Sequence, residues 1–334
     1  MHSNNGGQKL QIPDGSLIQP ALGANNPYYS FAQYLRARFG ERVWRVPLEA
    51  GFDCPNRDGV RAYGGCTFCT ADGSSAQLQD PEQSLAAQLN YGIEHKRRQT
   101  GAQKFIAYLQ SFTNTYGEVD YLRAVYQGAL AHPQVVMLAI GTRPDCLPPS
   151  VVDLLAEFSE RTELWLDLGL QTIHDQTQAR INRAHTAAEY FSAVARLRER
   201  APLVKICTHV IVGLPGEDLS MAQQTIEAVT RSEVAGIKLH NLCVLAKTKL
   251  AQEYARGEFE AIGLEEYLEF LLAVLPQLPP TLTVHRLMAE AAREDELIAP
   301  AWASDKDAFL LALRRACADR LVWQGRDLEA TPPA

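Results

Sequence analysis

The chain has 334 residues, of which 46% are hydrophobic and 21% are charged, and its formal net charge is −7. This length fits two domains or one large α/β barrel, and it can bury a core without disulfide or metal staples. The composition excludes wholesale disorder and a membrane bundle, since no apolar run approaches the ~18 residues that span a bilayer.

The N-terminal segment, residues 1–26, is rich in Asn, Gly, Gln and Pro and lacks the apolar core of a signal peptide. We expect it to form a flexible, solvated leader on a cytoplasmic protein.

From about residue 43, short β-like segments alternate with helical patterns. VVMLAIG and VKICTHVIVG are apolar on both faces, as strands covered by helices on two sides are. Six βα units predict an α/β fold, a partial (β/α)6 TIM-type barrel over residues 27–250, with a doubly wound open sheet as the alternative. The predicted strands are Val43–Leu48, Lys104–Phe112, Val135–Gly141, Thr162–Leu170, Leu203–Gly213 and Gly236–Leu245. The predicted helices are Pro81–Arg98, Tyr121–Leu130, Ser150–Phe158, Thr186–Arg200 and Ser220–Val229.

The pattern changes after the sixth predicted strand. Gly263–Leu278 is typical of an amphipathic helix, Leu282–Leu287 of a short strand and Asp305–Leu321 of a second helix. We expect residues 251–325 to form an α-rich C-terminal extension packed on the barrel, followed by a tail at residues 326–334.

The chain contains seven cysteines, an odd number that argues against a closed disulfide framework. Four are scattered and are predicted to be small buried apolar residues: Cys146, Cys207, Cys243 and Cys317. The other three, Cys54, Cys66 and Cys69, share the loop GFDCPNRDGVRAYGGCTFCT directly after the first predicted strand. Parallel α/β proteins build their sites at that end of a strand.

The spacing Cys-x11-Cys-x2-Cys offers three thiolates, which suit zinc, copper(I) or an iron–sulfur cluster. A structural zinc site needs a fourth ligand, and the nearest downstream histidine, His95, lies on a predicted helix. Three ligands without a fourth form an open, catalytic type of site. An iron–sulfur cluster is therefore favoured over zinc and over simple packing.

This loop resembles the cluster-binding loop of radical S-adenosylmethionine (SAM) enzymes. Phe68 occupies the aromatic position that precedes the last cysteine, although the superfamily usually has the shorter spacing Cys-x3-Cys-x2-Cys. The longer first gap resembles the elongator catalytic-subunit branch, and GFDCPNRDG…GGCTFC with later motifs is most similar to the YhcC-like bacterial family, over about residues 27–310. The resemblance implies that Cys54, Cys66 and Cys69 bind three irons of a 4Fe–4S cluster and that the fourth iron chelates SAM. It also implies reductive cleavage of SAM to methionine and a 5′-deoxyadenosyl radical, which abstracts hydrogen from an unreactive C–H bond.

Later strand ends carry groups suited to that cofactor. LQSFTNTYG presents Gln110, Thr113 and Asn114, where radical SAM enzymes hold the methionine amino group, and an ordinary polar turn is the alternative. LWLDLGLQT offers Asp167 and Gln171 to the ribose hydroxyls, although the family more often has Glu at position 167. An acidic residue within an apolar strand is costly unless it is paired or functional, which favours a site.

Two further segments complete the predicted SAM site. RINRAHT offers Arg180 and Arg183 to the cofactor carboxylate, since a guanidinium matches a carboxylate in shape and charge. For Arg180, an ordinary solvated arginine on a helix is the alternative. Relatives usually have Gly where this chain has Ala184. HVIVGLPGED contains Gly213 and Pro215 in a tight turn whose backbone can approach the flat adenine.

Candidate substrate residues follow on the sixth strand and in the extension. Lys238 and His240 lie in KLHNLCVLAKTKL, and His285 and Arg286 occur later. For each histidine, an ordinary structural role is the alternative.

The elongator-like resemblance implies tRNA, and specifically wobble-uridine side chains, as a substrate. Basic residues that could contact phosphates are Arg36, Arg38, Arg42, Arg45, Lys96, Arg97, Arg98 and Lys104. The net charge of −7 opposes RNA binding, so a small molecule or a peptide is the alternative substrate. The chemistry also implies an electron donor such as flavodoxin or ferredoxin and no membrane partner. The competing non-enzymatic hypothesis is a zinc-binding adaptor for RNA or protein.

Overall fold

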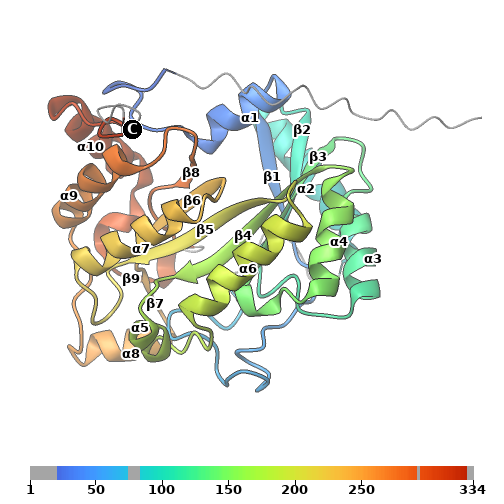
Figure 1. The fold of residues 1–334 in the computed structure, drawn as a ribbon, viewed down its shortest axis with the longest axis horizontal. Coiled ribbons are helices and arrows are strands. Elements are labelled where there is room, and N and C mark those ends of the chain that lie inside the picture. The colour runs from blue at the N-terminus through green and yellow to red at the C-terminus, as the bar shows by residue number, and fades with distance from the viewer. Residues whose placement is uncertain (1–20, 74–82, 292–293, 329–334) are drawn as a thin grey trace, which may run out of the picture.

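The computed structural model describes residues 21–73, 83–291 and 294–328 (Figure 1). Most of the predicted leader and tail, and the predicted helix start at Pro81, lie outside the described residues. The core is a seven-stranded parallel sheet in the order β1-β2-β3-β4-β5-β6-β8. Its strands are β1 Val43–Leu48, β2 Lys104–Leu109, β3 Val135–Thr142, β4 Glu163–Gln171, β5 Lys205–Val212, β6 Gly236–Asn241 and β8 Thr283–Arg286. A separate antiparallel pair joins β7 Val244–Leu245 to β9 Leu297–Ala299.

The sheet curls, and helices cover its outer face, which confirms the predicted partial barrel with an α-rich extension (Figure 1). The helices are α1 Phe31–Phe39, α2 Leu85–Thr100, α3 Val119–Ala129, α4 Pro149–Ser159, α5 Asp175–Arg180, α6 Ala187–Arg200, α7 Leu219–Arg231, α8 Lys249–Ala255, α9 Leu264–Val274 and α10 Lys306–Asp319. No helix in the described ranges is long and apolar enough to cross a membrane.

The predicted count of six sheet strands is one too few. The short strand expected within the extension is β8, which pairs in parallel with β6. Val284 of β8 joins the main apolar core, and Thr283 and His285 lie against Gly236 of β6. The last strand of the barrel therefore comes from the segment predicted to form the C-terminal extension.

The inner face of the curled sheet is closed at the N-terminal end of the strands by α1. Trp165 of β4 is 1% exposed and makes edge-to-face contacts with Phe31 and Tyr34 of α1, at ring centroid distances of 5.2 and 5.3 Å. Ser30 and Gln33 form a capping box that starts this helix. Large aromatic rings thus fill one end of the barrel.

Ala184 lies in the turn before α6 in a left-handed backbone conformation, with φ of +58°. This conformation costs an L-residue roughly 1–2 kcal/mol and costs glycine almost nothing, which explains why glycine suits this position. We expect Ala184→Gly to raise the free energy of unfolding by about 0.5–1 kcal/mol in urea denaturation.

The control is Ala195→Gly, at an exposed position within α6, which should lower that free energy by about 1 kcal/mol. Equal destabilisation by both substitutions would show that Ala184 is not strained.

Candidate active site

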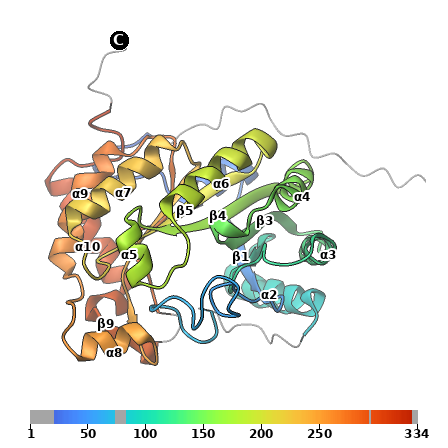
Figure 2. The same cartoon turned by 60° about the horizontal axis from the view of Figure 1, so that its bottom comes forward.

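The cysteine loop, residues 49–73, follows β1 at the carboxyl edge of the sheet. Figure 2 shows this blue loop below α5, on the side where the parallel strands end. The chain after α5 holds it in place: Asn182 donates from its side-chain amide to the carbonyls of Tyr63 (3.0 Å) and Gly65 (2.7 Å). The Thr67 N–H also donates to the Ile181 carbonyl at 3.0 Å. Hydrogen bonds therefore fix the loop to the segment that follows β4.

Cys66, the most buried cysteine of this loop, meets positive charge and hydrogen-bond donors. Cys66 is 5% exposed, and its Sγ lies 3.4 Å from the Asn56 amide nitrogen and 3.6 Å from Nη1 of Arg183. A hydrogen bond from Cys69, assisted by Arg183, lowers the pKa of the Cys66 thiol to about 5 despite burial. Thiolates in such surroundings bind soft metals.

Arg143, just after β3, is a candidate site residue that the sequence analysis missed. It is 2% exposed and donates two hydrogen bonds to Asp145, at 3.0 and 2.9 Å, while its remaining Nη1 is buried without a partner. Its charge also acts on Cys54 and Cys66. The motif GTRPDC follows a predicted strand, as the other candidate motifs do. The rule that polar groups at the carboxyl ends of parallel strands form the site would therefore have identified this arginine.

Buried polar atoms without partners gather at this edge of the described sheet. They include Thr113 Oγ1, Gln171 Oε1, Arg183 Nε, Arg143 Nη1 and Asn56 Oδ1. Buried polar groups in folded proteins are nearly always hydrogen-bonded, so such a group of orphans fits a polar ligand. Donors, acceptors and guanidinium groups beside three cysteines fit a 4Fe–4S cluster with SAM.

Asn114 and Gln110, two further residues after β2 that were predicted to bind SAM, have surroundings different from those of Thr113. The side-chain nitrogen of Asn114 donates to the carbonyls of Leu109, Ser111 and Gly141 at 3.2, 2.9 and 3.0 Å. This amide group fastens the loop, and it leaves Thr113 as the residue with an unused hydroxyl. Gln110 lies where the main chain passes Gly141, and its carbonyl would be 3.2 Å from a Cβ there.

Arg183 and Gln171 converge on Gly169, near the end of β4. Arg183 Nη2 donates to the Gly169 carbonyl at 2.8 Å, and a Cβ on Gly169 would lie 2.5 Å from that nitrogen. Gln171 has φ of +69° at a bulge in the β4–β5 pairing. The segment Gly169–Gln171 is therefore tightly packed against Arg183, and it places Gln171, which was predicted to contact the ribose, beside that arginine.

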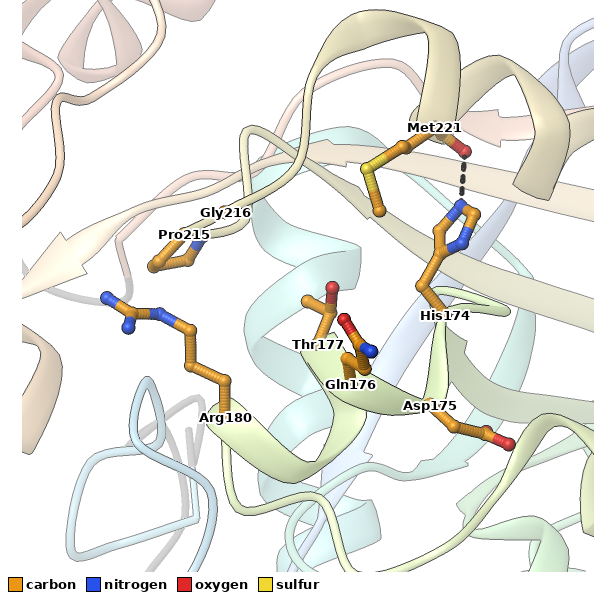
Figure 3. Close-up of a pocket in the computed structure, with 8 residues that line it drawn as sticks. All are labelled: His174, Asp175, Gln176, Thr177, Arg180, Pro215, Gly216 and Met221. Carbon is orange, nitrogen blue, oxygen red and sulfur yellow. Dashed lines mark hydrogen bonds between the residues drawn. The ribbon is translucent and has the colours of Figure 1, made fainter.

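The structure separates the two arginines of RINRAHT. Arg180 does not lie with Arg183; it lines a pocket of about 340 Å³ with Pro215, Gly216 and His174 (Figure 3). Its Nη2 is 3.9 Å from the carboxylate of Glu253.

Two other residues predicted to contact SAM pack against apolar side chains. Gly213, with φ of +85°, lies against Ile262, which a Cβ would approach to 3.2 Å. Phe68 packs on the apolar cluster that contains Leu214 and Leu242.

Asp167 lies inside the barrel and forms an ion pair with Lys238. Its Oδ2 is 2.5 Å from Lys238 Nζ, and both side chains are 4% exposed. Burial raises the pKa of Asp167, but Lys238 and His209 outweigh burial and hold that pKa well below its usual range. The sequence analysis gave Asp167 and Lys238 separate roles, on ribose and on substrate, whereas the structure makes them one pair.

The other predicted substrate residues occupy two levels of the barrel. Arg286 is paired with Lys238 in the β6–β8 register, and the His240 ring lies 5.5 Å from that of His209. His285 stacks on Phe31 at 3.8 Å, at the end that α1 closes. His285 therefore packs at the closed end and away from the cysteine loop.

Two buried histidines make stability depend on pH. Burial, then Arg183, lowers the pKa of His185 to about 2, and burial, then Lys238, lowers that of His209 to about 4. The folded state keeps both neutral while the unfolded chain takes up protons below about pH 6.5, so stability is full above that pH and falls on acidification.

We expect the unfolding free energy of cluster-free protein to fall between pH 7 and pH 5, with about 2 kcal/mol of that fall due to His185. His185→Gln should remove that share, whereas the same change at the exposed His95 should not. Urea titrations at both pH values measure this, and an unchanged pH dependence in His185→Gln would contradict it.

Comparison with protein families gives two matches. Residues 54–229 match the model of the radical SAM superfamily, and residues 234–317 match the radical SAM C-terminal domain. The chain is 39% identical to YtqA of Bacillus subtilis over 307 residues, covering 92% of this chain and 94% of that protein. It is 40% identical to YhcC of Escherichia coli over 286 residues, covering 85% and 90%.

More distant similarities follow. A tRNA uridine(34) acetyltransferase of Methanocaldococcus jannaschii is 25% identical over 164 residues, covering 48% of this chain and 29% of that protein. Among solved structures, Elp3 of Methanocaldococcus infernus has a TM-score of 0.61 at 16% identity, covering 83% of this chain and 63% of that one, which supports the fold. Enzymes of the matched superfamily use a 4Fe–4S cluster and SAM. The chain belongs to the radical SAM superfamily of enzymes, in the YhcC-like family.

Proposed function

We propose that this enzyme binds a 4Fe–4S cluster through Cys54, Cys66 and Cys69 and binds SAM at the carboxyl edge of the barrel. The observation that carries the proposal is the set of unpartnered buried polar atoms beside those cysteines, on strand ends that face the same edge. SAM bound there and reduced by one electron supplies methionine and a 5′-deoxyadenosyl radical, which removes a hydrogen atom from an unreactive C–H bond of the substrate. We further propose a cytoplasmic flavodoxin or ferredoxin as the source of that electron.

The residues of this chain have distinct tasks in this proposal. Arg143 and Arg183 offer a guanidinium nitrogen each to a carboxylate, and Thr113 and Gln171 offer oxygen acceptors to an amino or hydroxyl group. Burial of these groups keeps water out of the site, which strengthens their interactions with a charged ligand.

A zinc-binding adaptor fits these residues less well. A structural zinc needs four ligand atoms in one coordination sphere. Within the described ranges, the one group of three candidate ligand atoms within 4.8 Å of one another is Asp167, Cys207 and His209, and it contains none of the loop cysteines.

A second hypothesis concerns the identity of the substrate, which could be a tRNA. It is supported by the similarity to a tRNA uridine(34) acetyltransferase, which covers 48% of this chain. Several basic residues predicted to contact phosphates are engaged elsewhere: Arg97 and Arg98 pair with Glu94, and Arg38 pairs with Glu163. Arg45 stacks on Phe31 and Tyr108 inside the barrel. These contacts favour a small substrate over RNA.

The first test replaces the cluster ligands. We expect each of Cys54→Ala, Cys66→Ala and Cys69→Ala to lose the brown colour and most of the about four irons per chain after anaerobic reconstitution. Cys317→Ala, at a buried position in α10, is the matched control and should keep both. Full iron content in any of the three loop variants, or stoichiometric zinc in colourless protein, would refute the cluster assignment.

The second test addresses SAM. Arg143→Met should keep its iron but bind SAM at least about tenfold more weakly in equilibrium dialysis, because a charge-assisted hydrogen bond contributes about 1.5–3 kcal/mol. Asp145 keeps a partner in this variant, since Arg61 Nε lies 3.3 Å from it. The surface variant Arg123→Met is the control.

An unchanged SAM affinity in Arg143→Met would remove Arg143 from the proposed site. Formation of 5′-deoxyadenosine with dithionite as reductant reports cleavage independently of binding.

A further inference from the structure

The middle of the barrel interior carries more positive than negative charge. Three cations point inward from different strands: Arg45 from β1, Lys238 from β6 and Arg286 from β8, which we call the lumen cations. Arg45 lies over the rings of Phe31 and Tyr108 at 5.0 and 5.5 Å, and Lys238 and Arg286 are register partners. One carboxylate, Asp167, meets them among the described residues.

Asp167 compensates only one of these cations. Its 2.5 Å contact with Lys238 uses one carboxylate oxygen, and the other lies 3.6 Å from His209 Nε2. Within residues 21–73, 83–291 and 294–328, neither Arg45 nor Arg286 forms an ion pair or a side-chain hydrogen bond. Both are partly buried.

The neighbouring titratable groups do not change this balance. Burial lowers the pKa of His209 to about 4 and that of His240 well below its usual value, so both rings are neutral at pH 7. Burial raises the pKa of Tyr108, which stays protonated. The Nε2 atom of His240 is also buried without a partner, so it offers a further polar contact to a ligand.

At the closed end of the same barrel, by contrast, each of two cations contacts a carboxylate. There Glu163 pairs with Arg38 at 3.1 Å and with Lys205 at 2.7 Å, and its side chain is 7% exposed. Arg45 and Arg286 are partly removed from water without such a carboxylate, which points to an anionic partner that the protein chain does not supply at the middle level.

We propose that the lumen cations bind the anionic group of a small organic substrate, a carboxylate or a phosphate. This inference rests on the proposed function, since it places the substrate between the closed end of the barrel and the cysteine loop. Arginine matches both anions with a planar pair of donors, and Arg45 and Arg286 have theirs available. Because α1 and its aromatic rings close the far end, the interior suits a small molecule anchored by its charge, with its carbon atoms toward the cysteine loop.

The test measures anion binding directly. Malonate, inorganic phosphate and neutral malonamide are titrated calorimetrically into the reconstituted full-length protein in chloride-free buffer. We expect malonate or phosphate to bind and malonamide not to bind, and the stronger of the two anions identifies the carboxylate or phosphate class.

Arg45→Met and Arg286→Met should each weaken anion binding at least about tenfold, and Arg286→Lys should recover part of it. Arg36→Met, which removes an exposed arginine of α1, is the matched control and should bind normally. Equal weakening in the control, or no anion binding to the unaltered protein, would overturn the proposal. So would loss of tRNA binding in the Arg45 and Arg286 variants without any binding of the small anions.

Thermal unfolding without added anion separates a binding role from a structural one. Arg286→Met removes an unpaired cation and should leave the melting temperature unchanged or raise it. Lys205→Met should lower the melting temperature, because the buried Glu163 carboxylate then loses one of its two cation partners. A fall in Arg286→Met as large as that in Lys205→Met would overturn the proposal. Failure of the unaltered protein to form 5′-deoxyadenosine would instead refute the proposed function, and it would leave the anion titration interpretable.

Discussion

The site depends on the hydrogen bonds that join the cysteine loop to the segment after β4. Asn182 holds the loop backbone at Tyr63 and Gly65, and the next residue, Arg183, reaches both Cys66 and the Gly169 carbonyl. One short segment therefore orients a ligand loop, places a cation beside a thiolate and fixes the end of a strand. Because the two bonds from the Asn182 side chain go to backbone carbonyls, they position the loop main chain, and Arg183 adds a contact to the Cys66 side chain.

Charge is arranged in levels along the barrel axis. At the closed end, Glu163 is satisfied by two cations, and aromatic rings exclude water. At the middle level, Arg45 and Arg286 exceed what Asp167 can neutralise. At the open edge, Cys66 Sγ lies beside Arg183, and the charge of Arg143 acts on Cys54 and Cys66. At the closed end both of these cations contact a carboxylate, whereas the two levels above contain cations and polar atoms without protein partners, as expected of levels that bind ligands.

The sequence predicted features that depend on local patterns. The central strands were found because their apolar runs are continuous, and the cysteines because three thiols share one loop. Pairing between distant residues was not predicted, since nothing local tells that Asp167 and Lys238 point to the same side of different strands and meet at 2.5 Å. The same limit explains the misplaced β8, whose neighbour in space, β6, precedes it by 41 residues of intervening chain between Asn241 and Thr283. Arg143 is different, because it lies in a local motif at the end of the third strand. The sequence analysis considered the ends of the other strands but not of this one.

The net charge of −7 is a property of the whole chain, and it affects the attraction or repulsion of partners large enough to contact much of the surface. A polyanion such as RNA is such a partner, so the acidity weakens that hypothesis. A ligand inside the barrel experiences the few charges that face it, because salt screens distant exposed charges within about 8 Å at physiological ionic strength. An acidic protein can therefore have a cationic interior, and the two observations together favour a small anion over a nucleic acid.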